Sequence, residues 1–259
     1  MKKFFCSLAV IAAMFAFSAC QEKVDDPGKN NGQTENTGDK EYTVDQYGYA
    51  TYTHQGFQFK VKAGLITTTD AQKAIQHMRD DLDFIAENFP ENALKILRKH
   101  PIWMEENNTR NPSAAWCHVN ADYPASYGES YKGHCVEITN YKNYVAWSNQ
   151  NQPLMVLHEL GHLYHALGLG GETNSTIKNA YNNAKSKGLY TTGWYRYNTG
   201  GQRVKTNDVY CMNTMWEYFS EMTEAYFGEN DYYPFNITDL KEHDPMGYEM
   251  CEKIWGPRP

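Results

Sequence analysis

The stretch VLHELGHLYH, residues 156–165, carries the pattern on which the fold assignment depends. It holds three of the nine histidines of the chain, and one glutamate, among apolar residues. On a helix, His158 and His162 lie one turn apart on the same face, so both imidazole rings can direct a nitrogen at one metal ion. Glu159 lies about 100° further round the helix, beside such an ion rather than on it. The pattern therefore predicts a helix that presents a metal site with a carboxylate next to it.

A third ligand for the metal must come from another part of the chain. Zinc in a hydrolase is held by three protein ligands and keeps one open position. His165 is two turns from His158, about 10 Å along the helix axis, which is too far for one ion to bridge comfortably. We therefore expect His165 to be a packing residue. As a fourth ligand it would instead mark a closed, structural zinc site.

Three glutamates in TMWEYFSEMTEAYFG (214–228) are candidates for the third ligand. Glu217, Glu221 and Glu224 recur at intervals of four and three, so they share one face of a helix. The segment has no lysine or arginine to pair with them, as a surface stripe usually would. One glutamate can bind zinc while another accepts an N–H from a zinc-bound histidine and fixes its tautomer. The spacing alone leaves open whether Glu217 or Glu221 is the ligand, and a solvated acidic stripe is the remaining alternative.

The two segments together resemble a known family. The pair His158-Glu159-x-x-His162 and Glu217-Tyr-Phe-Ser-Glu221 is similar to the gluzincin metallopeptidases. Within them it most resembles the lethal-factor-type group, which includes anthrax lethal factor and the Pro-Pro endopeptidases. A wider part of the chain also resembles secreted zinc peptidase-like proteins of bacteria and fungi. The resemblance implies an α+β fold, namely a zincin-like metallopeptidase domain with a small sheet, a motif helix and a second helix that carries a ligand.

The resemblance also implies roles for individual residues. The group carries Glu-x-x-Ala-Glu with the first glutamate as ligand, a position that Glu217 occupies, and we then expect Glu221 to orient a zinc-bound histidine. The group also has a tyrosine seven residues before the ligand, where its hydroxyl helps to stabilise the tetrahedral intermediate, and Tyr210 has this spacing. Ser220 stands where the group usually has alanine, and both residues are small. The cofactor implied is Zn²⁺, held by His158, His162 and Glu217.

These residues predict a zinc-dependent endopeptidase. Zinc would activate a water molecule, Glu159 would take the proton from that water and pass it to the leaving amine, and Tyr210 would donate to the oxyanion. The strand expected at Cys135–Thr139 could be the sheet edge that pairs with an extended peptide. The alternative is a catalytically silent surface lipoprotein that keeps the zincin fold as a binding module, and a third reading is a structural zinc site.

Hydrophobic periodicity and turn residues predict the order of the elements. A strand is expected over 52–62, and a helix of about five turns begins at a capping box of Thr69 and Gln72 and ends at Pro90. The other expected elements are a short helix over 91–99, strands over 102–105 and 135–139, a motif helix opened by Pro153, and helices over 173–187 and 212–227. With most helices late in the chain, this order predicts an α+β protein.

The N-terminal segment predicts export and a lipid anchor. Residues 1–19 have two lysines followed by an apolar run, the layout of a secretory signal peptide. The end of this run, Phe17-Ser18-Ala19-Cys20, resembles a bacterial lipobox, which implies cleavage before Cys20 and lipidation of that cysteine. An ordinary signal peptide with an incidental cysteine is the alternative. Residues 20–41 are polar and predict a flexible tether to a domain over 42–259. We expect an outer-membrane lipoprotein that faces the periplasm or the cell surface.

Composition narrows the choice of partners. The chain has 259 residues, 41% hydrophobic and 21% charged, as in a soluble globular protein, and its formal charge of −7 argues against nucleic acid. The expected partners are a peptide or protein substrate and the membrane at the lipid anchor, and we expect a monomer. Four cysteines beyond the signal region lack paired C-x-x-C spacing. Disulfides between Cys117 and Cys135 and between Cys211 and Cys251, or four free thiols, both remain open.

Overall fold

The computed structural model describes residues 42–110, 113–198 and 201–258. These described residues all belong to one compact unit. The expected signal peptide, the lipidation site Cys20 and the tether lie outside the described residues. Within the three described ranges, no helix is both long and apolar enough to cross a bilayer.

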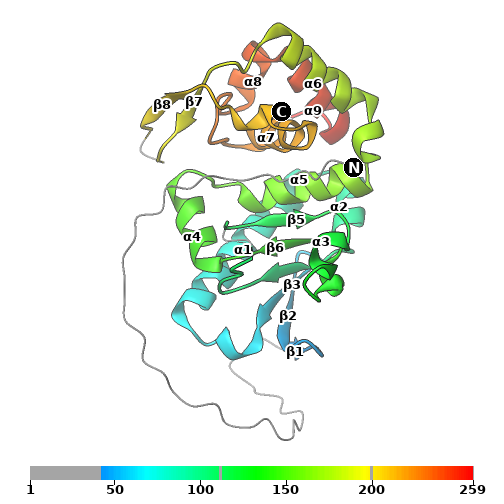
Figure 1. Ribbon diagram of the computed structural model, residues 1–259, viewed down its shortest axis with the longest axis vertical. Helices are drawn as coiled ribbons and strands as arrows, with labels where there is room; N and C mark the ends of the chain where they lie inside the picture. The colour runs from blue at the N-terminus through cyan, green and yellow to red at the C-terminus, as the bar shows by residue number, and fades with distance from the viewer. Residues whose placement is uncertain (1–41, 111–112, 199–200, 259) are drawn as a thin grey trace, which may run out of the picture. The chain divides into compact units, whose positions relative to one another are not determined.

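Six strands of the described chain form the main sheet, in the order β1-β2-β3-β4-β6-β5 (Figure 1). The pairs β1–β2, β2–β3 and β5–β6 are antiparallel, and the central pairs β3–β4 and β4–β6 are parallel. The mixed α+β class predicted from the sequence is confirmed. The strands are β1 (Thr43–Val44), β2 (Tyr49–His54), β3 (Phe57–Lys62), β4 (Ile102–Met104), β5 (Trp116–His118) and β6 (Cys135–Ile138).

One face of this sheet carries the hydrophobic core. Helix α1 (Thr69–Asn88) buries the stripe that the periodicity predicted, in one cluster with apolar side chains of β3, β4 and β6. Such a stripe, with apolar residues every three or four positions, is what packs a helix onto a sheet. The other elements on this side are α2 (Glu91–Leu97), α4 (Tyr141–Gln150) and α5 (Met155–Leu167), and α5 contacts both β5 and β6.

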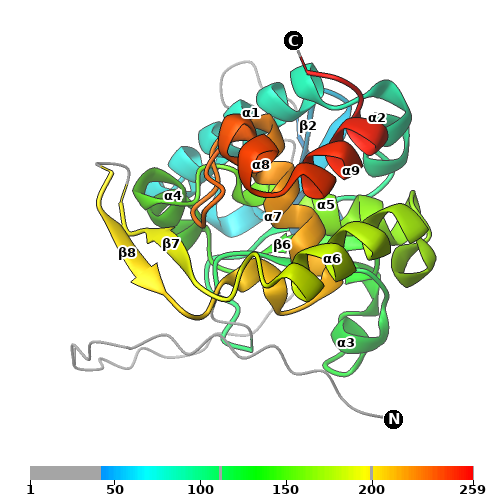
Figure 2. The ribbon, with the colours of Figure 1, turned by 90° about the horizontal axis from the view of Figure 1, so that it is seen from above.

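A second group of helices lies on the other side of α5 (Figure 1). Helix α7 packs along α5 and also contacts α6, α8 and α9 (Figure 2). This arrangement brings the two helices predicted to carry the metal ligands side by side. The bounds are α6 (Ser175–Lys187), α7 (Met215–Phe227), α8 (Ile237–His243) and α9 (Pro245–Trp255), with the hairpin β7 (Gly193–Arg196) and β8 (Arg203–Thr206) between α6 and α7 in the chain.

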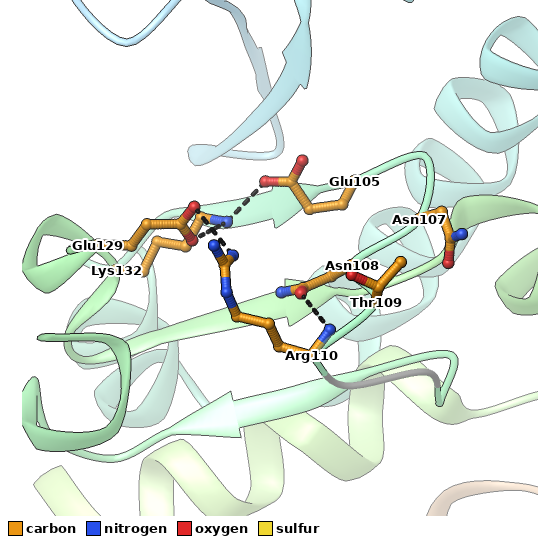
Figure 3. A pocket seen from close by; sticks show the side chains of 7 residues that line it. All are labelled: Glu105, Asn107, Asn108, Thr109, Arg110, Glu129 and Lys132. Atoms are coloured by element: carbon orange, nitrogen blue, oxygen red, sulfur yellow. Dashed lines mark hydrogen bonds and ion pairs between the residues drawn. The ribbon is translucent and has the colours of Figure 1, made fainter. Parts of the chain in front are cut away.

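The opposite face of the sheet carries a largely buried group of charges, which we call the Lys132 cluster (Figure 3). The Lys132 ammonium lies 2.6 Å from carboxylate oxygens of Glu105 and Glu137 and 2.9 Å from one of Glu129. His118 on β5 approaches Glu137 on β6 to 2.7 Å. Burial alone would raise the pKa of Glu137, but His118 and Lys132 bring it to about 2. The cluster thus brings one buried ammonium into contact with all three carboxylates.

A pocket of about 210 Å³ opens beside the Lys132 cluster. Its lining is polar and includes none of the residues expected to bind metal or to catalyse. The lining residues are Glu105, Asn107, Asn108, Thr109, Arg110, Glu129 and Lys132 (Figure 3).

The strand expected over 52–62 is two strands joined by a tight turn. His54 pairs with Phe57, which leaves Gln55 and Gly56 as a two-residue loop. Both have positive φ, 49° and 80°, as the turn that matches the twist of a hairpin requires. Glycine adopts this conformation without a steric penalty, so Gly56 was the sequence signal for the turn.

Two further expectations differ in position, and for the cysteines the structure shows the free thiols that were one of the two open alternatives. The cap of α1 is Thr68 rather than Thr69, because the Thr68 hydroxyl accepts from the Ala71 N–H at 3.3 Å. The strand expected at Cys135–Thr139 is not an edge, since β6 lies between β4 and β5, and the short β5 is the edge on that side. All four cysteines beyond the signal region are free thiols, so neither proposed disulfide is present.

Candidate metal centre

Helix α5 places the two histidines of the motif as the spacing predicts. The His158 N–H donates to the Leu154 carbonyl at 2.9 Å, so the motif lies within regular helix. The two imidazole rings are neighbours, with centroids 4.7 Å apart. Leucines on the other side of the helix are fully buried in the core, which fixes the rotation of α5 and directs the histidines toward α7.

Helix α7 brings Glu217 to both histidines. The Thr214 hydroxyl caps the helix by accepting the Glu217 N–H at 3.1 Å, so Glu217 lies in the first turn. One oxygen of its carboxylate, Oε2, lies 3.1 Å from Nε2 of His158 and 3.2 Å from Nε2 of His162. The three groups offer ligand atoms that all lie within 4.8 Å of one another. A cation placed among these three atoms would find two imidazole nitrogens and one carboxylate oxygen, a donor set that suits zinc.

The outer nitrogens of the two rings are also held by α7. Nδ1 of His158 lies 2.6 Å from Oε1 of Glu224, and Nδ1 of His162 lies 3.1 Å from the Ser220 hydroxyl. The side chains of Glu224 and Ser220 are buried. The contacts at Nδ1 therefore fix the orientation of both rings, and both Nε2 atoms face Glu217.

The hydrogen bond expected for Glu221 is made by Glu224 instead. Glu221 accepts from the side-chain amide of Asn230 at 3.0 Å. The reason lies in helix geometry, since seven residues of rotation return to within about 20° of the starting direction and four residues miss it by about 40°. The imidazole of His158 therefore lies between two glutamates that are two turns apart on α7, with Nε2 facing Glu217 and Nδ1 facing Glu224. Glu221 remains close enough to form a second group of possible ligands with His158 and Glu224.

Glu159 lies beside this group and is not among the possible ligands found in the described residues. Burial raises the pKa of its carboxyl above the ordinary value, and the neighbouring His162 and His158 oppose that effect. A carboxylate with a raised pKa accepts a proton more readily near neutral pH than an exposed one does. The position and the pKa both suit a proton carrier.

Tyr210 lies next to His158, as its spacing from Glu217 suggested. It begins the short 3₁₀ helix η4 (Tyr210–Met212), and its ring centroid is 6.4 Å from that of His158. On its other side it stacks on Tyr232, with centroids 6.3 Å apart. The structure thus brings Tyr210 and the four motif residues to one place.

The surroundings of the histidines are unusually rich in buried carboxylates. Glu221, Glu224 and Asp231 are at most 4% exposed. Burial raises the pKa of Glu224 to about 7 and that of Asp231 to about 6, and it raises the pKa of Glu221 well above the usual range. We call the set of His158, His162, Glu217, Glu221, Glu224 and Asp231 the α5–α7 cluster. In the described residues, the ion pairs of its carboxylates all involve the two histidines.

Asp231 was not predicted as part of this site. No periodic pattern in the sequence connects the segment around it to α5 or α7. In the structure Asp231 accepts from the Gln152 side chain at 3.1 Å, and its neighbour Asn230 holds Glu221. The adjacent polar pair Asn230-Asp231 directly after α7 was the available signal.

His165 points away from the α5–α7 cluster and packs in the core, as expected. It is fully buried, its Nε2 lies 3.2 Å from the Gly171 carbonyl oxygen, and its ring centroid is 4.1 Å from that of Trp216. Neither group of possible metal ligands in the described part of the chain includes it.

The chain matches no protein-family model, and searches among curated proteins and among solved structures find no match. The functional interpretation therefore rests on the residues of the α5–α7 cluster and on the two sequence motifs.

Proposed function

We propose that this protein is a zinc-dependent endopeptidase with a zincin-like domain, in which His158, His162 and Glu217 hold the metal. The observation that carries the proposal is the position of one Glu217 oxygen, 3.1 Å and 3.2 Å from the two histidine Nε2 atoms. A neutral imidazole offers Nε2 as a lone pair when Nδ1 carries the hydrogen. Three lone-pair donors directed at one point repel each other unless a positive charge lies among them. A metal ion supplies that charge.

The donor set fits zinc better than calcium or magnesium. Two imidazole nitrogens and one carboxylate oxygen are a common set for catalytic zinc, whereas the harder ions prefer oxygen ligands. When bound, Zn²⁺ would polarise a substrate carbonyl and lower the pKa of a coordinated water. With three protein ligands, a fourth position is left for water or substrate, which supports a catalytic rather than a structural role.

The residues around the ligands have the chemistry that peptide hydrolysis requires. Glu159 is next to the ligands and has a raised pKa, so it can accept a proton from the attacking water and return it to the leaving amine. The Tyr210 ring lies beside that of His158, with centroids 6.4 Å apart, and its hydroxyl is the group that would donate a hydrogen bond to the oxyanion of the intermediate.

Strand β5 is the part of the sheet suited to bind an extended peptide. It is antiparallel to β6, lies at the edge of the main sheet and contacts α5. An edge strand has backbone donors and acceptors that can pair with an added strand. We propose that β5 takes the role expected earlier for Cys135–Thr139.

We also propose that the chain is exported and anchored by lipid at Cys20. This proposal rests on the sequence before residue 42. Replacement of Cys20 by alanine should release the protein from the membrane fraction, and a wild-type protein found wholly in the soluble fraction would contradict the anchor.

The proposal is tested by zinc analysis and peptide digestion on the same preparations. Wild type should contain one zinc per chain and cleave members of a peptide library, detected by mass spectrometry. Glu159→Gln should keep the zinc and lose cleavage, because it retains the ligands and removes the proton acceptor. Zinc bound with full stoichiometry but no cleavage of any peptide would favour the catalytically silent binding module. Zinc retained after replacement of both His158 and His162 by alanine would overturn the site.

A further inference from the structure

We propose that Ser220 is a positioning residue that fixes the tautomer of His162 and presents Nε2 of that histidine to the metal. The inference rests on the proposed zinc site and adds a residue to it. The side chain of Ser220 reaches α5 at two points, 3.0 Å from the His158 carbonyl oxygen and 3.1 Å from Nδ1 of His162. It is fully buried, so no bulk water competes for these contacts.

The two contacts determine where the hydrogens lie. A serine hydroxyl has one hydrogen to donate, and a backbone carbonyl oxygen can only accept. The hydroxyl therefore donates to the His158 carbonyl and accepts from Nδ1–H of His162. In the reverse arrangement the Ser220 and His158 oxygens would lie 3.0 Å apart with no hydrogen between them. The favoured arrangement places the hydrogen of neutral His162 on Nδ1 and leaves a lone pair on Nε2.

The same logic applies to the other histidine, so α7 serves both rings. His158 is held at Nδ1 by Glu224, and His162 is held at Nδ1 by Ser220. Ser220 and Glu224 are one turn apart on α7, and the two histidines are one turn apart on α5. Glu217 is three residues before Ser220 on the same helix, so one face of α7 supplies the third ligand and both outer contacts.

The distance between the two helices depends on a glycine opposite Ser220. A Cβ atom added at Gly161 would lie 3.0 Å from Oγ and 3.6 Å from Cα of Ser220. The first of these separations is tighter than most real Cβ contacts, so a side chain at position 161 would push against the hydroxyl. Gly161 thus lets α7 approach close enough for Ser220 to reach both acceptor and donor on α5.

The decisive experiment removes the hydroxyl and follows both zinc affinity and the His162 tautomer. Ser220→Ala should weaken zinc binding by about 10–100-fold, the usual effect of losing a partner behind a metal ligand. Affinity is measured by competition with a chromophoric chelator. In the zinc-loaded protein, nitrogen-15 shifts should place zinc on Nε2 and the hydrogen on Nδ1 of His162 in wild type, and this Nδ1–H should exchange faster with water in the variant. Ser220→Thr, which keeps a hydroxyl, should recover part of the affinity.

A matched control is Ser148→Ala. Ser148 is also buried, on α4, and its hydroxyl has no hydrogen-bond partner among the described residues. The same atom is removed there without breaking a hydrogen bond to α5 or α7, so zinc affinity and the His162 tautomer should stay as in wild type. Gly161→Ala should weaken zinc binding in the same direction as Ser220→Ala.

The outcomes separate this inference from the zinc site itself. Wild type that binds zinc while Ser220→Ala binds it within about twofold of wild type would overturn the role of Ser220 and leave the site intact. Zinc found on Nδ1 of wild-type His162, with the hydrogen on Nε2, would also overturn it, whether or not any variant folds. A wild type that binds no zinc would overturn the proposed function and, with it, the role of Ser220 toward the metal.

Discussion

Two groups of buried charge in this protein are built on opposite principles. The Lys132 cluster surrounds one ammonium with three carboxylates and adds a histidine at 2.7 Å from Glu137. The α5–α7 cluster gathers four carboxylates around two histidines, and in the described chain none of its ion pairs involves lysine or arginine. In the first group one ammonium contacts all three carboxylates, whereas the carboxylates of the second group have no lysine or arginine partner among the described residues and need positive charge from protons or from a metal.

The pKa shifts of Glu137 and of the carboxyls that surround the two histidines differ in direction, although the two histidines lower the pKa of Glu217 itself. Glu137 beside Lys132 has a pKa of about 2, although burial alone would raise it. Burial raises the pKa of Glu224 to about 7 and that of Asp231 to about 6. Burial therefore opposes the simultaneous ionisation of Glu221, Glu224 and Asp231 at the second site. A cluster that is short of cations is therefore a better candidate for a metal site than one that is merely rich in acids.

Removal of the metal ligands should have the largest effect and should act on one cluster only. Replacing both His158 and His162 by alanine should abolish zinc binding, because only Glu217 remains of the proposed ligands. At free zinc about 1,000-fold above its dissociation constant, binding stabilises the folded wild type by about 4 kcal/mol. Thermal unfolding with and without a chelator should therefore differ for wild type and coincide for the variant. A chelator-induced shift that survives in the variant would place the metal elsewhere.

Removal of Lys132 should destabilise the other cluster by a similar or slightly smaller amount. Lys132→Met leaves Glu105, Glu129 and Glu137 without their shared cation, and loss of one partner of a buried ion pair costs about 3–5 kcal/mol. Urea unfolding measures the loss, and zinc stoichiometry should stay at the wild-type value. A change below about 1 kcal/mol would mean that water compensates the carboxylates, and the contrast between the two clusters would weaken.

Tyr210→Phe should leave both clusters intact and slow the reaction. Loss of one donor to the oxyanion raises the barrier by about 2–4 kcal/mol, while zinc content and unfolding remain as in wild type. Turnover of a peptide found in the library digest is the measurement. Tyr197→Phe is the matched control, because Tyr197 is 54% exposed and is not among the proposed site residues. Equal turnover in the two variants would remove Tyr210 from the mechanism.

Glu224→Gln and Glu221→Gln should differ in zinc affinity, and this difference is the smallest of the four expected effects. Glu224 accepts from His158, so its replacement should weaken zinc binding by about 10–100-fold. Burial raises the pKa of Glu221 well above its usual range, and in the described chain Glu221 makes no hydrogen bond to either histidine ring that would be lost, so its replacement by the neutral amide of glutamine should change zinc binding less. Chelator competition ranks the two variants. A stronger loss with Glu221→Gln would restore the assignment made from the sequence.

The helices that carry the site could be predicted because their signals are local. The four-residue spacing of His158 and His162 and the capping threonine before Glu217 each act within one or two turns of helix. The choice between Glu221 and Glu224 could not be made in this way. It depends on how α7 crosses α5, which is set by packing between Gly161 and Ser220 and by the core on either side.

The edge strand of the sheet was predicted wrongly for a related reason, since β5 and not β6 lies at that edge. Strand β5 has three residues and lies in a loop rich in asparagine and glycine, so it has no periodicity to detect. Its existence depends on pairing with β6 and on the contact of His118 with Glu137. Helices α8 and α9 were also not predicted, although Asn236 and Asp244 cap them in the usual way.

The free thiols have a practical consequence for the biochemistry of this protein. Cys135, Cys211 and Cys251 are buried and Cys117 is half-buried, and none of the four is joined to another cysteine. The described fold therefore contains no disulfide that a reductant could break. Mild reductants that do not bind metals should leave its unfolding curve unchanged. A loss of activity caused by dithiothreitol but not by a phosphine reductant would then report metal capture by the dithiol rather than damage to the fold.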